Sequence, residues 1–180
     1  MGRLTGHLKT VFHHKNLVLK YCFKAGIPWQ GLKHDLSKFS PTEFIPSVKY
    51  YTDGKHSPTV EERKLLGYSS AWLHHKGRNR HHFEYWIEFN WKNEIMYKCP
   101  MPLKYVKEMF CDRLAATKTY LKDRYDDFAP LEYYLARDER KFMHEKTYTL
   151  LEILLVKLAF EGEESVFSYM KTLKNKEKND

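Results

Sequence analysis

The residues best suited to chemistry are the histidines, nine of which, out of ten, precede residue 83. Four of them form two pairs, His74-His75 and His81-His82, within nine residues. Lys or Glu would solvate a surface with less risk, and aromatic residues flank both pairs, so we expect at least one member of each pair to point inward. The spacing alone does not decide which histidine of each pair faces inward. A cluster that only packs, or that chelates metal adventitiously, is the alternative interpretation.

A second set of candidate ligands precedes this block. His7 and His14 are seven residues apart, which places them on one stripe of a predicted helix. His34 and Asp35 are adjacent, and an imidazole nitrogen beside a carboxylate oxygen suits divalent Mn, Fe, Co, Ni or Zn. Each signal also has a plain structural interpretation: partly exposed histidines on an amphipathic helix, and an ordinary pair of residues at a helix end.

Asp112 is the most distant candidate. It falls in a predicted helix over residues 103–124 that is apolar on two sides and therefore central. A buried carboxylate is costly unless it is paired or coordinated, so metal coordination is the sharper interpretation. A salt bridge to Arg113 or Arg124, or a partly exposed position, is the alternative.

The elements that must position these residues are helical. Helical spacing of apolar residues predicts helices over residues 4–24, 59–75, 80–96, 103–124, 131–140 and 143–161, with a short segment over 32–39 and a break at 77–79. Another helix starts at Ser40, with Pro41 at its first position; Glu43 either closes a capping box there or orients a ligand imidazole. No alternating pattern is long enough for a sheet. We therefore predict one all-α domain over residues 1–180, with a Lys-rich tail from about 172.

Composition limits the class of protein. The chain has 180 residues, 42% hydrophobic and 16% aromatic, with a mean hydropathy of −0.67, which excludes a disordered chain and a membrane-embedded one. Three cysteines without a Cys-x-x-Cys pair and no export signal favour a cytoplasmic location. A net charge of +8 points to anionic partners without identifying them.

These motifs together resemble the HD-domain superfamily, all-α metal-dependent phosphohydrolases with a His…His-Asp…Asp ligand set. The segment from His34 to Lys38 is similar to the family's His-Asp-x-Gly-Lys, with Ser37 in place of Gly, and Cys111-Asp112-Arg113-Leu114 resembles its terminal Ala-Asp-Arg-Leu. The resemblance implies a helical bundle with a central metal site. Its ligands would be His7 (or His14), His34, Asp35 and Asp112.

The pattern also resembles a small, largely uncharacterised microbial and phage family over residues 7–113. The shared features are the His7/His14 stripe, the run His-Asp-Leu-Ser-Lys-Phe-Ser-Pro-Thr-Glu-Phe at 34–44, and the segment 72–86 with its Asn-x-His-His. The dense histidine block is similar to HD members that carry extra histidines for a second metal. Those members include two-iron phosphodiesterases and, more rarely, oxygenases. On the basis of this resemblance, we select His75 and His82 as second-metal or phosphate-facing groups, with His74 and His81 as substitutes.

The sequence therefore predicts a phosphohydrolase of the HD type that acts on a nucleotide or another small phosphoester. Asp35, Lys38 and Arg78 are the candidate catalytic residues: Asp35 as a metal ligand, and Lys38 and Arg78 as cations that would neutralise phosphate charge. We expect one or two divalent transition ions (Mn, Fe, Co or Ni, with Zn also compatible), a small phosphorylated substrate and no membrane partner; oligomeric state is undetermined. The alternatives are a di-iron HD-type oxygenase and a non-enzymatic module that keeps the histidines for metal-stabilised folding or binds nucleic acid. Nucleic acid is less favoured as a partner than a small phosphorylated substrate.

Overall fold

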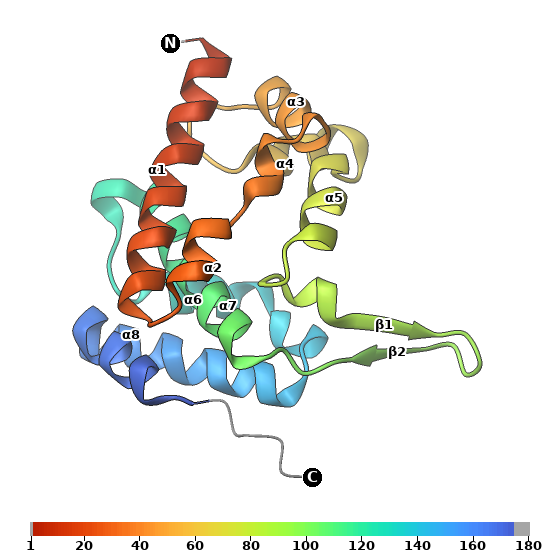
Figure 1. Ribbon diagram of the computed structural model, residues 1–180. Coiled ribbons are helices and arrows are strands. Elements are labelled where there is room, and N and C mark those ends of the chain that lie inside the picture. Colours follow the sequence, from red (N-terminus) through yellow and green to blue (C-terminus); the bar gives the residue numbers. More distant parts are fainter. Residues whose placement is uncertain (1, 175–180) are drawn as a thin grey trace.

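The computed structural model describes residues 2–174, and helices form most of that part of the chain (Figure 1). The α-helices are α1 (Arg3–Lys24), α2 (Pro28–Lys33), α3 (Pro41–Lys49), α4 (Pro58–Leu66), α5 (Ser70–Arg78), α6 (Leu103–Leu121), α7 (Ala129–Arg137) and α8 (Glu145–Thr172). Short 3-10 turns occupy Leu36–Phe39 (η1), Phe83–Trp86 (η2), Lys122–Arg124 (η3) and Glu139–Phe142 (η4). The strands are β1 (Ile87–Asn90) and β2 (Ile95–Lys98). The prediction of an all-α protein is confirmed. Of the predicted tail, residues 175–180 lie outside the described part.

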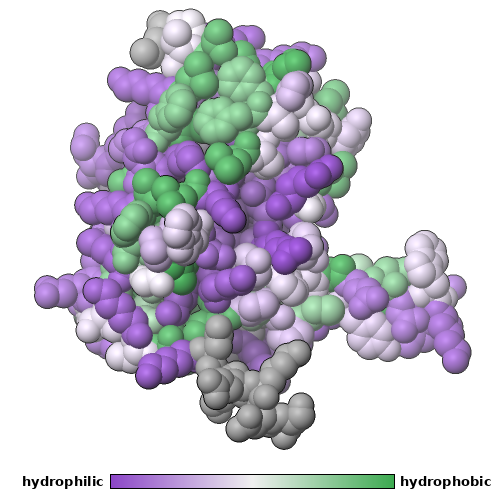
Figure 2. All heavy atoms as spheres, viewed as in Figure 1, coloured by the Kyte–Doolittle hydropathy of each residue, from purple (hydrophilic) through white to green (hydrophobic). Residues whose placement is uncertain are grey.

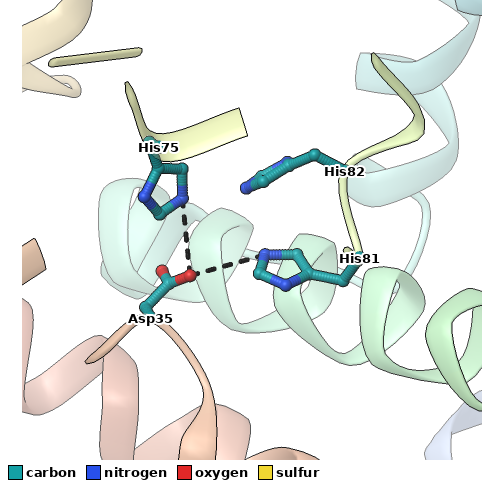
Figure 3. Close-up of side chains that lie close together, drawn as sticks. All are labelled: Asp35, His75, His81 and His82. Atoms are coloured by element: carbon teal, nitrogen blue, oxygen red, sulfur yellow. Dashed lines mark ion pairs between the residues drawn. The ribbon is translucent and has the colours of Figure 1, made fainter. Parts of the chain in front are cut away.

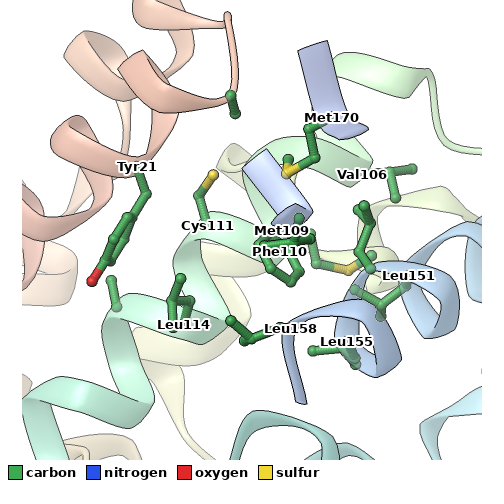
Figure 4. Close-up of a cluster of buried hydrophobic side chains, with 14 of the residues drawn as sticks. Tyr21, Val106, Met109, Phe110, Cys111, Leu114, Leu151, Leu155, Leu158 and Met170 are labelled. Carbon is green, nitrogen blue, oxygen red and sulfur yellow. The ribbon is translucent and has the colours of Figure 1, made fainter. Parts of the chain in front are cut away.

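The hydrophobic core lies around α6, which packs against α1 on one side and α8 on the other. Figure 4 shows Phe110 and Leu114 of α6 among leucines and methionines, and both side chains are fully buried. The face of α1 that joins this core carries Val11, His14 and Val18. The helical repeat that buries the valines thus also carries His14 inward.

A tight connection between α1 and α2 sets the position of the His34-Asp35 pair. Gly26, with φ of 75°, ends α1, and Pro28 begins α2. Gly31 then lies so close to α1 that a Cβ there would be 2.8 Å from the Cβ of Cys22. This close approach brings the end of α2, and His34 after it, back over α1.

The predicted helix over 59–75 is wrong, because two helices occupy this stretch. Gly67 adopts φ of 79° and ends α4, a left-handed conformation that glycine takes without strain. The Ser69 hydroxyl then accepts a hydrogen bond of 3.0 Å from the Trp72 N–H and caps α5. The predicted break at 77–79 is also displaced: α5 continues through Arg78, and the chain leaves the helix at Asn79.

The predicted helix over 80–96 is wrong as well. This stretch forms a loop, the η2 turn and an antiparallel hairpin that pairs Ile87 with Lys98 and Asn90 with Ile95. The hairpin projects from the helical body (Figure 1). Its aromatic and β-branched residues favour strands, and the stretch between Asn90 and Ile95 supplies the turn.

The longest helix, α8, is divided at Gly162, whose φ of 81° and ψ of 176° are not helical. The predicted end at residue 161 corresponds to this point, but the chain resumes a helix up to Thr172. No helix in the described range of 2–174 is long and apolar enough to span a bilayer.

The backbone at Gly162 gives a stability prediction. Gly162→Ala is expected to lower the free energy of unfolding by about 1–3 kcal/mol, because an L-residue is strained at this φ and ψ. Gly77→Ala is the matched control: Gly77 lies in α5 with open space around it, so alanine should raise stability by about 0.5–1 kcal/mol. Urea unfolding of both variants tests the pair, and shifts of the same sign would contradict it.

Candidate metal centre

Five segments bring imidazoles and carboxylates to one buried place. Asp35 occupies the junction between α2 and η1 with a left-handed backbone (φ 53°, ψ 29°), a conformation that Asp tolerates better than most residues. The other contributors are His14 on α1, His34 after α2, His75 on α5, His81 and His82 before η2, and Asp112 on α6. We call these seven residues the His/Asp cluster.

The first half of the His/Asp cluster consists of His14, His34, Asp35 and Asp112. One nitrogen or oxygen from each residue lies within 4.8 Å of the others. Asp112 Oδ1 is 3.0 Å from His14 Nε2 and 3.4 Å from His34 Nε2. Asp35 Oδ2 is 3.2 Å from His34 Nε2. The sequence-based ligand set is therefore brought together, with His14 rather than His7 as the member from α1.

The second half consists of Asp35, His75, His81 and His82, again with one atom from each within 4.8 Å of the others. Figure 3 shows the three imidazoles around the Asp35 carboxylate. Asp35 Oδ1 is 3.4 Å from His75 Nε2 and 3.5 Å from His81 Nε2. Because Oδ2 faces the first half and Oδ1 the second, Asp35 lies between the two ligand sets.

Two glutamates hold the imidazoles by their other nitrogens. His34 Nδ1 donates to Glu108 Oε1 at 3.0 Å, and His81 Nδ1 is 3.2 Å from the same oxygen. Glu43 accepts from His75 Nδ1 and His74 Nδ1, each at 2.7 Å. These contacts leave the Nε2 atoms of His34, His75 and His81 free to act as ligands, as outer carboxylates do in metal sites.

The sequence left two roles open for Glu43, a capping box or the orientation of a ligand imidazole, and its contacts fit the second. The Ser40 side chain makes no capping hydrogen bond, and its buried hydroxyl has no partner among the described residues. The capping box is therefore wrong, because the Glu43 carboxylate is engaged by His74 and His75 instead.

The orphaned polar atoms of the protein gather in the His/Asp cluster. In the described part of the chain, nine buried side-chain nitrogens and oxygens lack a hydrogen bond of suitable geometry. Six of these nine are the Nε2 atoms of His14, His34, His81 and His82 and both oxygens of Asp35. Among these atoms, Asp35 Oδ2 has the Lys38 ammonium 2.6 Å away as an ion-pair partner. Buried polar atoms that lack hydrogen bonds are costly, whereas lone pairs that converge on shared points suit a cation. The donor set and its geometry therefore fit divalent metal ions.

Electrostatics in the cluster follow from burial and mutual charge. Burial acts to raise the pKa of Asp35, but the nearby charges of His34 and Lys38 hold it well below its usual value. The pKa of Asp112 is also held well below its usual value, despite burial, mainly by the close imidazoles of His14 and His34. Burial, together with the charges of His81 and His75, lowers the pKa of His82. The carboxylates therefore stay ionised and His82 stays neutral, which are the forms that bind metal. Despite burial, the charge of Asp35 and the contacts with Asp112 and Glu108 raise the pKa of His34 well above its usual value, so a cation that binds at its Nε2 would have to displace a proton.

The predicted cations differ in position. Lys38, on η1, places its ammonium nitrogen 2.6 Å from Asp35 Oδ2, and its side chain is 31% exposed. The Asp112 side chain is 18% exposed, more than those of the cluster residues with which it forms ion pairs. Solvent therefore reaches the cluster beside Lys38 and Asp112. Arg78 is exposed at the end of α5, and no contact with the cluster is found for it within residues 2–174.

His7 lies outside the cluster although it shares the stripe of His14. Its ring packs against Phe44 and Tyr51, with centroids 5.7 and 5.8 Å apart. Burial, aided by the charge of Lys38, lowers the pKa of His7 to about 4. The unfolded chain binds a proton at His7 below about pH 6.5 while the folded chain does not, so stability falls as the pH drops from 6.5 toward 4.

His7→Phe is expected to remove this acid sensitivity. The contribution of His7 amounts to about 2 kcal/mol of stability lost at pH 5 relative to neutral pH. Unfolding free energies of the wild type and the variant at pH 7.5 and pH 5 give the difference. Equal losses in the two proteins would show that His7 does not stay neutral in the fold.

Sequence reasoning missed Glu108, and it ranked His81 only as a substitute. Glu108 was the charged exception on the apolar row of a central helix, one turn before Asp112. Its burial beside two imidazoles gives that exception a reason. The signal was present, but only the fold reveals which imidazoles Glu108 meets.

The fold and the site together define the class of this protein: it is all-α, with a buried cluster of five histidines and two aspartates. The chain matches, over residues 3–157, the family described as "Family of unknown function (DUF5662)", and it belongs to that family. The match covers the whole His/Asp cluster. No curated protein and no solved structure matches the chain.

Proposed function

We propose that the protein is a metal-dependent phosphohydrolase of the HD type, with two divalent transition ions, acting on a nucleotide or another small phosphoester. The observation that carries the proposal is the position of Asp35 between two four-residue ligand sets. A carboxylate shared in this way suits a pair of cations held close together. Such a pair activates water and stabilises the attacking and leaving oxygens of a phosphoryl transfer.

The two ligand sets differ in composition. The first offers two imidazoles and two carboxylates, a mixed set that suits six-coordinate ions such as Mn, Fe, Co or Ni with open positions for water. The second offers three imidazoles and the shared Asp35. Glu108 and Glu43 fix the imidazole orientations, so both sets are organised before an ion binds.

Lys38 has the position of a phosphate-binding group. Its ammonium contacts Asp35 and lies on the solvent side of the cluster. Burial acts to lower the pKa of Lys38, but the carboxylates of Asp35 and Asp112 raise it, so the side chain stays charged. A charged donor at the open side would neutralise the non-bridging oxygens of a substrate phosphate.

Metal content and phosphate release test the proposal together. Protein prepared without a His tag or chelating resin should contain close to two transition ions per chain by elemental analysis. It should release phosphate from a panel of nucleotides and from p-nitrophenyl phosphate, and lose this activity after chelation. Absence of transition metal from such protein would overturn the proposal.

Lys38→Met is expected to lower kcat/KM by about 10²–10³-fold while leaving the metal content unchanged, since it removes a charge that stabilises the transition state. Arg78→Met is the comparison: Arg78 is exposed, so its loss should change kcat/KM by less than about threefold. Equal decreases of kcat/KM in the two variants would contradict this prediction and would show that Arg78 also takes part in catalysis.

A di-iron oxygenase of the HD type is the second candidate, and the imidazole-rich second ligand set favours it, since imidazole suits iron. Iron-loaded protein would then consume oxygen with an organic substrate and release no phosphate. Oxygen uptake and phosphate release, measured on the same preparation, separate the two functions.

A further inference from the structure

Positive charge is concentrated at the start of the chain. The first 52 residues contain eight Lys and Arg and only two acidic residues, so they carry +6 of the net charge of +8. Both acidic residues are buried, Asp35 in the His/Asp cluster and Glu43 beside it in contact with His75. The outer surface of α1, α2, η1 and α3 therefore presents cations without an acidic side chain of its own.

Large apolar side chains share this surface. Six of them, from α1, α2 and η1, form what we call the α1–α2 face: Phe12 (50% exposed), Phe23 (57%), Trp29 (70%), Leu32 (46%), Leu36 (55%) and Phe39 (38%). Figure 2 shows hydrophobic patches on this side of the molecule with hydrophilic residues between and around them. An exposed apolar set of this size marks a surface for interaction.

The α1–α2 face is continuous across its elements. The rings of Phe12 and Phe39 are in contact, with centroids 5.7 Å apart, which joins α1 to η1. Gly31 of α2 packs directly on Leu19 of α1. Lys9, Lys20 and Lys33 are exposed on the same elements and form no ion pair with any residue of the described part. Lys24 does not belong to this set, because Glu163 of α8 pairs with it.

We propose that the α1–α2 face docks on an anionic lipid surface. Lysines beside Trp, Phe and Leu are the combination that binds the interface of such a membrane, with cations at the headgroups and apolar side chains among the acyl chains. The hydropathy of the chain led us to expect no membrane partner, but a surface contact requires no apolar span.

Charge and residue type argue against other occupants. Two copies of this face would bring unpaired cations together, so a symmetric dimer through it is disfavoured. Nucleic-acid sites use arginine forks on phosphate, and Arg3 is the single arginine among the first 52 residues. Aliphatic residues such as Leu32 and Leu36 add little to base stacking but contribute to burial in lipid.

The experiment uses cosedimentation of the full chain with vesicles of phosphatidylcholine alone or mixed with phosphatidylglycerol. We expect binding only to the mixed vesicles. Lys20→Gln with Lys33→Gln should weaken it about 25-fold, since each lysine near an anionic surface contributes about fivefold. Trp29→Ser should weaken it about tenfold.

The hairpin supplies the matched control. Trp91 is 85% exposed, but its hairpin carries Glu88 and Glu94 beside Lys92 and Lys98 and is balanced in charge. Trp91→Ser should therefore leave vesicle binding unchanged. The proposal is overturned if the protein ignores the mixed vesicles, binds both kinds equally, depends on Trp91 as much as on Trp29, or binds unrelated DNA or RNA instead. Metal content and phosphate release of the same variants should stay unchanged, so this proposal and the enzymatic one fail separately.

Discussion

If the protein is the proposed two-ion phosphohydrolase, Asp35→Asn is expected to empty both proposed metal sites at once and to abolish phosphate release. Asp35 is the one residue that belongs to both four-residue ligand sets, with Oδ2 toward His34 and Oδ1 toward His75 and His81. Asparagine keeps the shape of the side chain and tolerates the left-handed backbone at this position, so the fold should survive. The variant removes the negative charge that both cations would share.

Metal content should fall from about two ions per chain toward zero, and kcat/KM should fall by about a thousandfold or more. Elemental analysis and phosphate release are measured on the same samples, and circular dichroism confirms that the helices remain. Asp53→Asn is the matched control, since Asp53 has nearly the same φ of 54° but is exposed and belongs to no ligand set. It should retain both ions and full activity.

Asp112→Asn refines the same prediction, because Asp112 belongs to the first ligand set alone. Its metal content should fall from about two ions to about one. If Asp35→Asn also retains one ion, the shared position of Asp35 is contradicted, and the centre would consist of two independent sites.

The sequence predicted those parts of the site that depend on local periodicity. His14 is carried inward by the same repeat that buries Val11 and Val18, and Asp112 follows from the apolar row of a central helix. His34 and Asp35 were recognisable as a motif. In each case, the residues that decide the position lie within a turn or two of the candidate.

The parts that could not be predicted depend on contacts between distant segments. Which ring nitrogen of His75 and His81 faces the cluster is set by where Glu43 and Glu108 lie, 32 residues from His75 and 27 from His81 along the chain. The hairpin was missed because aromatic residues at near-helical spacing favour a helix as readily as a strand over a few residues. Gly67, two residues before Ser69-Ser70, was a local signal for the break between α4 and α5, but the helical periodicity on either side obscured it.

Removal of metal is expected to destabilise the whole fold rather than the site alone. The cluster joins α1, α2, η1, α5 and α6, so its ligands hold together helices that are far apart in sequence. A ligand present at a thousandfold its dissociation constant stabilises the folded state by about 4 kcal/mol, and two such ions by about 8 kcal/mol. For a domain of this size, that corresponds to roughly 15–30 °C in Tm.

Thermal unfolding with and without a chelator measures this effect. The wild type should lose most of the expected shift on chelation and recover it when Mn, Fe, Co or Ni is restored. His7→Phe should behave in the same way, because the His7 ring packs against Phe44 and Tyr51 and does not belong to the cluster. Asp35→Asn should melt at the same temperature with or without chelator, since it lacks the carboxylate that both ligand sets require. If the wild type holds two ions but its Tm does not change on chelation, the prediction is contradicted, and the bundle would be rigid without metal. The burial of the cluster residues is the reason to expect the opposite result.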